Sequence, residues 1–282
     1  MIRIGLTGWG DHPAIHSLEK STRNKLATYA SHFPTVEVDS AFYSIISPHQ
    51  YSKWIEQTPS TFTFVVKAFQ AFTGHDRKTY TRKEIKEMIK NYKDGIQPLI
   101  DKNQLQCLLF QFPPWFDASK AHVQKLKFLR QQFEGYPLAL EFRNRSWFEG
   151  NLEHETLRFM YDYQWIHSIC DEPQAGKGSV PIINTTTHPD QAIIRFHGRN
   201  VHGWNNNGQS NWRSVRFLYN YSENELKEWC TRIHHLEKEV NDITILFNNN
   251  SGGDAYHNAK QLIDLLDIEY DQLNPKQIGL FD

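Results

Sequence analysis

The feature that most constrains the fold is a regular alternation of strand-like and helix-like runs along the whole chain. Runs rich in β-branched, aromatic and other apolar residues lie at 2–9, 35–42, 62–69, 105–112, 137–143, 165–171, 192–198 and 243–249. Several segments between them have helical spacing, and two begin with capping-box pairs, Thr81 with Glu84 and Ser222 with Glu225. Strands that alternate with helices form parallel sheets, and eight such units are typical of a closed barrel. The sequence therefore predicts an α/β protein built as a single (β/α)8 TIM barrel.

One unit and the end of the chain depart from this pattern. The segment at 172–191 is rich in Pro, Gly and Thr, so we expect an irregular unit after the sixth strand. The sequence predicts one barrel domain over residues 1–270 and a C-terminal tail over residues 271–282. An open, doubly wound sheet is the alternative fold, because the number of strands does not by itself require closure.

Composition narrows the classes of protein to be considered. The net charge is -1, so any binding of polyanions would have to come from a local patch. The sequence has neither a signal-like start nor an apolar run of about 18 residues, and the expected location is cytoplasmic. Cys107, Cys170 and Cys230 lie far apart in the sequence, which indicates neither a disulfide framework nor a zinc ribbon.

Polar side chains end the predicted strands on one face. In the run LALEFRNRSWF at 138–148, Leu138, Leu140 and Phe142 share one face, and Glu141 and Arg143 share the other. Applying the same alternation to every strand gives an inward set of Thr7, Trp9, Glu37, Asp39, Lys67, Gln111, Glu141, Arg143, Asp171, Arg195, His197 and Asn248. Active sites of barrels lie at this end of the strands, so we expect a site here. A structural layer of buried salt bridges is the alternative.

A resemblance to a known family is carried by the blocks VEVDSAFY, FTFVVKAF, LLFQFPPWF, LALEFRNRSWF, IIRFHGR, FLYNYSENELKEW and ILFNNNSGGDAYHNAKQL. In this order they resemble the blocks of the domain-of-unknown-function family 72, also called YecE-like. The resemblance runs from about Ile2 to Leu266 and implies a TIM barrel, but it implies no established activity. Asp39 stands where the family usually has Asn, and Asn250 stands where it usually has an acidic residue.

The inward groups have side chains suited to acid–base chemistry on an anion. His197 and Glu141 are the predicted acid–base pair, and Lys67 would neutralise developing charge. Arg143 and Arg195 would clamp a phosphate, because guanidinium groups pair with it in a bidentate way. We therefore predict an enzyme that acts on a phosphodiester or nucleotide derivative. Further catalytic candidates are Glu37 and Asp171, and further substrate contacts are Asn248, Gln111, Trp9, Tyr43 and Trp204.

The loop after the eighth strand is a candidate phosphate-binding loop. Ser251, Gly252 and Gly253 precede a helix that starts near Asp254. Backbone N–H groups at a helix N-terminus bind phosphate in many barrels. A tight turn with Asp254 as an ordinary N-cap is the alternative.

Three other functions stay open. Lys67 could form a Schiff base in an aldolase-like lyase. The barrel could instead be a non-catalytic binder of nucleic acid or of a phosphorylated metabolite, through the ring-rich loop at 198–221 with Arg199, Arg213 and Arg216. A glycosidase is a third choice, because a cation near each acid disfavours a protonated carboxyl group. The same cations argue against a metal centre, so no cofactor is predicted and a divalent metal is only a minor alternative.

The C-terminal tail carries a candidate partner motif. Gln277, Leu280 and Phe281 have the spacing of Gln-x-x-Leu-Phe, which resembles the bacterial sliding-clamp-binding pentapeptide. The sequence therefore predicts a bacterial sliding clamp as a partner, which would favour DNA or a nucleotide as substrate. Docking of Leu280 and Phe281 back onto the barrel is the alternative.

Overall fold

A computed structural model describes residues 1–16, 24–205 and 212–276, without the side chains of residues 213 and 214. Eight strands form one closed parallel barrel in chain order, and β1 pairs with β8 from Ile2 opposite Ile243 to Leu6 opposite Phe247. The closed barrel confirms the predicted TIM fold and excludes the open sheet. The strands are β1 (Ile2–Thr7), β2 (Thr35–Val38), β3 (Thr63–Lys67), β4 (Leu105–Gln111), β5 (Leu138–Glu141), β6 (Trp165–Asp171), β7 (Gln191–Phe196) and β8 (Asp242–Phe247).

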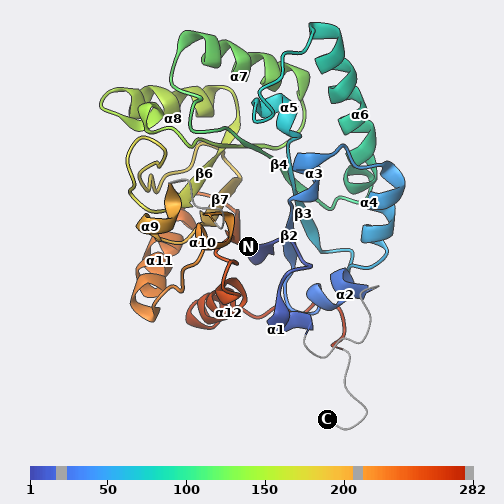
Figure 1. The fold of residues 1–282 in the computed structure, drawn as a ribbon. Helices are drawn as coiled ribbons and strands as arrows, with labels where there is room; N and C mark the ends of the chain where they lie inside the picture. The colour runs from blue at the N-terminus through green and yellow to red at the C-terminus, as the bar shows by residue number, and fades with distance from the viewer. Residues whose placement is uncertain (17–23, 206–211, 277–282) are drawn as a thin grey trace.

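Helices surround the barrel, as Figure 1 shows in a view along its axis. Both predicted capping boxes are present: Thr81 starts α6 and Ser222 starts α11. The stretch between β6 and β7 contains no helix, which confirms the predicted irregular unit. The helices are α1 (Pro13–His16), α2 (Lys25–Tyr29), α3 (Ser40–Tyr43), α4 (Pro48–Ile55), α5 (Gln70–Thr73), α6 (Arg82–Asp101), α7 (Lys120–Gln132), the 3-10 helix η2 (Arg145–Phe148), α8 (Leu152–Asp162), α9 (Val201–Trp204), α10 (Trp212–Val215), α11 (Glu223–Leu236) and α12 (Asp254–Leu265).

The apolar core has two parts, one inside the barrel and one between the barrel and the helices. Strand residues such as Ile4, Leu6, Val36 and Phe247 pack with the helices in the outer part. The inner part consists of Val65, Cys107, Leu109, Ala139, Ile166, Ile193 and Leu246. These two sets are the two faces that the alternation predicted, so polar residues that continue the inner set reach the mouth of the barrel.

The chain after α12 returns to the barrel wall. Tyr270 donates its hydroxyl hydrogen to the Ile2 carbonyl oxygen and accepts from the Ile4 N–H group. The Asn274 side chain donates to the carbonyl oxygens of Ala27 and Gln57. The predicted motif residues Gln277, Leu280 and Phe281 lie outside the described residues. No helix within the described ranges is long and apolar enough to cross a membrane.

Candidate functional site

A buried network of charged side chains fills the mouth of the barrel. Its centre is Arg195 of β7, which donates from Nε and Nη2 to Glu37 of β2 at 2.6–3.0 Å. Arg195 Nη1 donates to Glu141 of β5 at 2.6 Å. The side chains of these three residues are at most 1% exposed. The predicted convergence of polar groups on the barrel axis is therefore present, and its core is excluded from water.

Arg143 extends this network toward β6. Its Nε lies 2.7 Å from Glu141 Oε1, and its Nη1 donates to Glu172. Its Nη2 donates to His197 Nε2 at 2.8 Å. Arg143 and Arg195 thus have their donors directed at carboxylates and an imidazole of the protein. In this arrangement neither guanidinium presents the free fork that the predicted phosphate clamp requires.

The environments of the carboxyl groups push their pKa values apart. Burial opposes ionisation of Glu141, but Arg143, Arg195 and His197 outweigh it and hold the pKa of Glu141 well below its usual range. Burial instead raises the pKa of Glu172 to about 7, despite the neighbouring Arg143. Burial also raises the pKa of Glu37 against the effect of Arg195. Carboxyl groups with divergent pKa values in one cluster are typical of acid–base sites.

His197 is held as a neutral imidazole. Burial and the nearby Arg143 keep its pKa well below its usual value. Because guanidinium only donates, the His197 Nε2 atom accepts from Arg143, and the proton lies on Nδ1. Nδ1 is 2.9 Å from the side-chain amide of Asn248, which must turn its oxygen toward this proton. His197 therefore links Arg143 to Asn248, and its basic lone pair is already engaged.

Asp171 does not belong to the inward set, and this prediction was wrong. On β6 the inward residues are Ile166, which joins the inner core, and Ser168, which donates to Glu141. Asp171 has the opposite parity and faces the helix layer. It accepts from Arg199 at 2.7 and 2.8 Å and from the Trp229 indole of α11. Asp171 therefore fastens α11 and the loop after β7 to the barrel.

Glu172, the residue after Asp171, is the acid that this end of β6 directs into the network. It accepts from Arg143 and, at 2.6 Å, from the Val180 N–H group. Cys170 also lies at this face, close to Glu141 and His197. Sequence reasoning missed both, because Glu172 lies beyond the strand end and Cys170 was considered only as a metal or disulfide residue.

One half of the mouth is closed by Trp204 of α9. This side chain is 2% exposed and donates from Nε1 to the Gly178 carbonyl oxygen at 3.1 Å. The centre of its ring is 5.2 Å from the guanidinium group of Arg143 and 4.3 Å from that of Arg216. Trp204 therefore covers the charged network. The sequence predicted this ring as a substrate contact, but in the structure it is buried.

Arg199 and Arg216 of the loop at 198–221 also have partners within the protein. Arg199 pairs with Asp171 and, at 3.0 Å, with Glu225 of α11. Arg216 packs on the rings of Trp204 and Trp212. The side chain of Arg213 lies outside the described part of the structure. Arg199 and Arg216 thus stabilise the loop itself, and their geometry does not favour the predicted contact with nucleic acid.

The other half of the mouth is partly open. Lys67, at the end of β3, pairs with Asp39 at 3.0 Å, and their side chains are 13% and 42% exposed. Trp9, Gln111 and Asn248, also predicted to face the mouth, are half-buried. Tyr43 is exposed on α3. The predicted substrate contacts of this half are therefore within reach of a ligand.

His75 is a candidate that sequence reasoning missed. It follows α5, whose C-cap Gly74 has a φ of 79°, a left-handed conformation that favours glycine. The His75 Nδ1 atom lies 2.8 Å from the Thr73 hydroxyl oxygen. Burial, followed by the charges of Lys67, Arg143 and Lys125, lowers its pKa to about 4. His75 is therefore a neutral imidazole in a cationic environment at the edge of the mouth.

The predicted phosphate loop leads into α12. Ser251 and Gly252 are exposed, and Gly253 has a φ of 85° as the N-cap residue. A Cβ atom on Gly252 would lie 2.7 Å from Leu218 and 2.8 Å from an Asp254 carboxylate oxygen. Both contacts are with the ends of side chains, so a larger residue at position 252 would displace Leu218 and Asp254 but not the backbone. The carboxylate of Asp254 competes with an anion for the same helix N-terminus.

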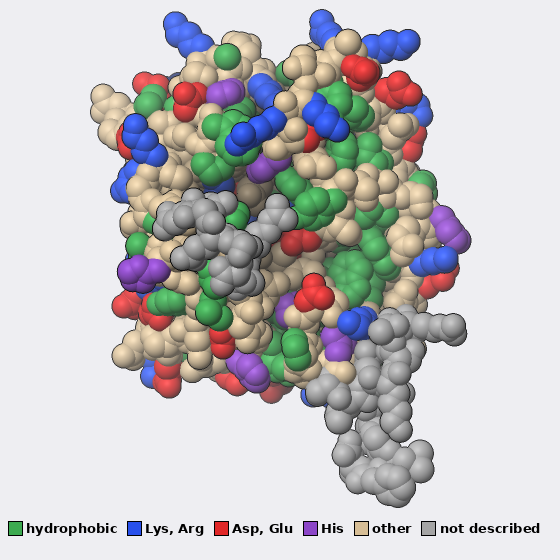
Figure 2. All heavy atoms as spheres, viewed as in Figure 1, with side chains coloured by type: hydrophobic (Ala, Val, Ile, Leu, Met, Phe, Trp, Pro, Cys, Tyr) green, Lys and Arg blue, Asp and Glu red, His purple; other side chains and the backbone are tan. Residues whose placement is uncertain are grey.

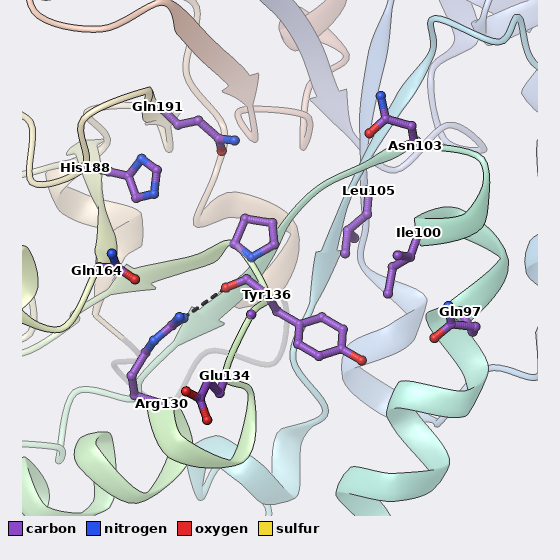
Figure 3. Close-up of a pocket in the computed structure, with 12 residues that line it drawn as sticks. Gln97, Ile100, Asn103, Leu105, Arg130, Glu134, Tyr136, Gln164, His188 and Gln191 are labelled. Carbon is purple, nitrogen blue, oxygen red and sulfur yellow. Dashed lines mark hydrogen bonds between the residues drawn. The ribbon is translucent and has the colours of Figure 1, made fainter.

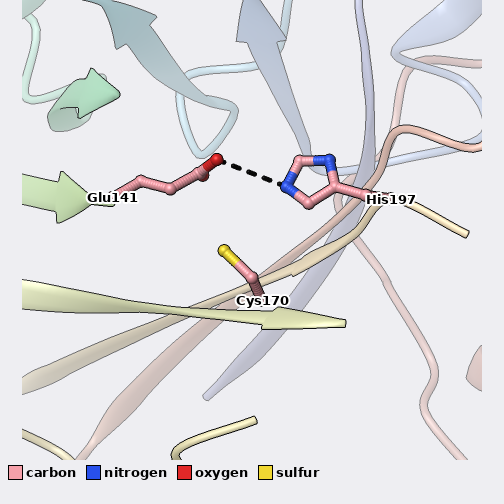
Figure 4. Close-up of side chains that lie close together, drawn as sticks. All are labelled: Glu141, Cys170 and His197. Atoms are coloured by element: carbon pink, nitrogen blue, oxygen red, sulfur yellow. Dashed lines mark ion pairs between the residues drawn. The ribbon is translucent and has the colours of Figure 1, made fainter. Parts of the chain in front are cut away.

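Glu141, Cys170 and His197 have ligand-type atoms within 4.8 Å of one another (Figure 4). They are the group that could hold a metal ion within the described residues. Burial holds the pKa of the Cys170 thiol well above its usual value, so this group stays protonated. Arg143 contacts both Glu141 and His197. A guanidinium in this position opposes a divalent cation by charge repulsion.

A cleft of about 830 Å³ lies at the opposite end of the barrel (Figure 3). It is lined by residues at the starts of strands, such as Leu105 and Gln191, and by Arg130, which donates to the Tyr136 carbonyl oxygen at 2.9 Å. This end of a TIM barrel generally serves stability. The mouth with the charged network is therefore the better candidate for a reaction site.

Comparisons with known proteins agree with the resemblance seen in the sequence. The model of the family "Protein of unknown function DUF72" matches residues 3–279. The "UPF0759 protein YunF" of Bacillus subtilis (strain 168) is 48% identical over 282 residues, which is 100% of each chain. A crystal structure of a DUF72 family protein from Enterococcus faecalis V583 has a TM-score of 0.90 and 37% identity, covering 99% of this chain and 100% of that chain. Another, from Thermotoga maritima MSB8, has a TM-score of 0.81 and 30% identity, covering 95% and 100%. The chain therefore belongs to the DUF72 family of proteins of unknown function.

Proposed function

We propose that the protein is an enzyme that acts on a phosphate-bearing substrate at the open half of the barrel mouth. The observation that carries this proposal is the charge around His75. Burial is the largest cause of the lowered pKa of this imidazole; three cations, Lys67, Arg143 and Lys125, lower it further, and one carboxylate, Glu141, opposes them. A position where positive charge disfavours imidazolium is one where the same charge favours a bound anion.

The surface of the open half of the mouth also carries basic side chains. Figure 2 shows Lys, Arg and His side chains close together on the part of this face where α5 lies. Lys67, at the end of β3, is partly open to solvent, and its Nζ atom lies 3.0 Å from Asp39. A phosphate bound at Lys67 would lie beside the charged network without displacing it.

The groups at this position support acid–base chemistry on such a substrate. The Thr73 hydroxyl engages His75 Nδ1, which leaves Nε2 as the atom that can accept a proton from water or a substrate hydroxyl. The charge of a bound phosphate would raise the pKa of this imidazole from about 4 toward neutrality, so the substrate itself would activate the base. Lys67 would stabilise negative charge that develops on the phosphate.

Glu37, Glu141, Arg195 and His197 are then positioning residues. Glu37 pairs with Arg195, Glu141 pairs with both Arg195 and Arg143, and His197 connects Arg143 to Asn248. The Schiff-base alternative has less support, because Lys67 in an ion pair with Asp39 is a charged ammonium and therefore a poor nucleophile.

The test is a titration of the protein with pyrophosphate and nucleoside monophosphates, together with turnover of chromogenic phosphomonoesters and phosphodiesters. Lys67→Ala should weaken binding about tenfold or more, whereas His75→Gln should lower kcat with a small change in KM. Lys90→Ala is the matched control, because Lys90 is a 73% exposed lysine in an ion pair with Asp94 on α6. Equal binding by the Lys67→Ala and Lys90→Ala variants would refute the phosphate site. Binding without turnover of any ester would instead support a non-catalytic barrel.

A further inference from the structure

Two large aromatic side chains are exposed at the rim of the open half. Tyr43 on α3 is 70% exposed, and Trp115, in the loop after β4, is 48% exposed. Exposed rings of this size at the functional end of a barrel are a frequent feature of binding surfaces. They belong to different βα units, so their common position results from the fold and not from one local sequence.

Half-buried rings connect these two exposed ones. Tyr43 meets Phe42 edge-to-face with ring centroids 5.1 Å apart, and Phe42 meets His75 in the same way at 4.9 Å. His75 in turn meets Trp115 at 6.1 Å. The four rings thus form a continuous structure, which we call the aromatic ridge (Tyr43, Phe42, His75 and Trp115).

Cations lie on the aromatic ridge at two places. Lys67 Nζ is 4.9 Å from the centre of the Phe42 ring, and the Arg77 guanidinium is 4.3 Å from that of Trp115. Arg77 is exposed and has a φ of 55°, a left-handed conformation that is uncommon for residues other than glycine. Rings that alternate with cations along one surface match the alternation of bases and phosphates in a nucleic-acid strand.

We propose that the aromatic ridge binds single-stranded nucleic acid. One base stacks on Tyr43 and another on Trp115, and phosphates between them lie against Lys67 and Arg77. Two separate exposed rings favour an oligonucleotide over a mononucleotide, which would use only one of them. A duplex is disfavoured because its bases are already stacked on one another. This inference rests on the proposed function, since it places a phosphodiester beside His75.

The test measures binding of a fluorescein-labelled oligothymidylate of about eight nucleotides by anisotropy, beside thymidine monophosphate and a duplex. Trp115→Leu and Tyr43→Leu should each weaken binding of the single strand by about 5- to 100-fold. Tyr161→Leu is the matched control, because Tyr161 is a 65% exposed ring on α8, and it should change affinity less than twofold. Trp115→Phe should bind between wild type and Trp115→Leu, since it keeps part of the stacking surface. Far-UV circular dichroism checks that each variant is folded.

The outcomes separate this inference from the proposed function. Equal binding of the single strand by wild type, Trp115→Leu and Tyr43→Leu would overturn the inference. So would an affinity for the monophosphate that matches that of the oligonucleotide. If either of these results were found but pyrophosphate binding still depended on Lys67, the proposed function would stand and only the nucleic-acid inference would fall. If neither pyrophosphate nor the oligonucleotide bound less tightly to Lys67→Ala than to Lys90→Ala, both the proposed function and this inference would be refuted.

Discussion

Arg195→Met is the substitution that most directly tests the charged network. Arg195 is 1% exposed in its side chain and contacts Glu37 and Glu141. In the variant Glu141 keeps Arg143 and Ser168, but Glu37 keeps only the Thr7 hydroxyl at 3.3 Å. Breaking a buried ion pair by removing one partner costs about 3–5 kcal/mol, because the other charge stays buried and uncompensated.

This loss can be converted into a change of melting temperature. At about 2.1 cal/mol/K per residue, a chain of 282 residues has an unfolding entropy of about 0.6 kcal/mol/K. We therefore expect Arg195→Met to lower Tm by about 5–8 °C at pH 8, measured by calorimetry. Arg158→Met is the control, because Arg158 is 74% exposed and its pair with Asp162 spans 3.7 Å. An exposed pair of this kind is worth about 0.5 kcal/mol, so Tm should fall by about 1 °C or less.

The pH dependence gives a second check with a defined sign. Burial already raises the pKa of Glu37 above its ordinary 4.5, and loss of the Arg195 charge raises it further. A carboxyl group with a raised native pKa destabilises the fold as pH rises through that value. The difference in stability between wild type and Arg195→Met should therefore be largest near pH 8 and shrink toward pH 5. The double variant Glu37→Gln/Arg195→Met should be more stable than the sum of the single effects predicts. A pH-independent loss, or one no larger than that of Arg158→Met, would refute this reasoning.

Three further predictions concern other parts of the chain. Asp171→Asn should lower the free energy of unfolding by about 2–3 kcal/mol in urea denaturation, because Arg199 and Trp229 both donate to this buried carboxylate. The affinity of this variant for pyrophosphate should stay within twofold of that of wild type. A large loss of affinity would show that Asp171 belongs to the binding site after all. Burial raises the pKa of Glu172 from 4.5 to about 7, so wild type should lose about 3 kcal/mol of stability relative to Glu172→Gln between pH 4.5 and 7.5. If the free energies of unfolding of wild type and Glu172→Gln changed with pH in the same way, the raised pKa of Glu172 would be refuted. We also propose that the C-terminal motif binds a bacterial sliding clamp, so the full chain should bind a clamp in calorimetry and the Leu280→Ala/Phe281→Ala variant should not. Equal binding, or none, for both chains would exclude this partner.

The barrel and the charged residues on its strands were predictable, because both follow from the alternation of side chains along a strand. A strand places alternate residues on opposite faces, so the apolar residues of β5 fix the direction of Glu141 and Arg143. The same rule placed Glu37 and Arg195 at the centre of the mouth. Closure of the sheet then brings these strand ends together whatever the loops do.

The rule failed where alternation is weak. The β6 run WIHSICD carries apolar and polar residues on both faces, so its sequence does not define which face is inward. Alternation placed Asp171 in the mouth, whereas its partners Arg199 and Trp229 lie 28 and 58 residues further along the chain. The tertiary fold brings such partners together, and no local sequence pattern predicts them.

The orientations of side chains in the loops could not be predicted for a related reason. His75, Glu172 and Trp204 all lie beyond the strand ends, where the backbone has no fixed period. Their positions depend on single conformations, such as the left-handed Gly74 before His75. These residues decide which half of the mouth is open and which is closed. The strand sequences alone therefore could not predict which half is open to a ligand.

In the proposed function, the closed half of the mouth sets the chemistry of the open half. A buried network of ion pairs is weak evidence for stability, because the loss of hydration offsets much of the attraction between its charges. Its position suggests another role: Glu141 and Glu172 fix Arg143, and the charge of Arg143 reaches His75 across the boundary between the halves. Trp204 keeps water from this network, which lowers screening and lets that charge act at a distance. A rigid, dry half with fixed charges can therefore set the properties of a base that is itself open to substrate.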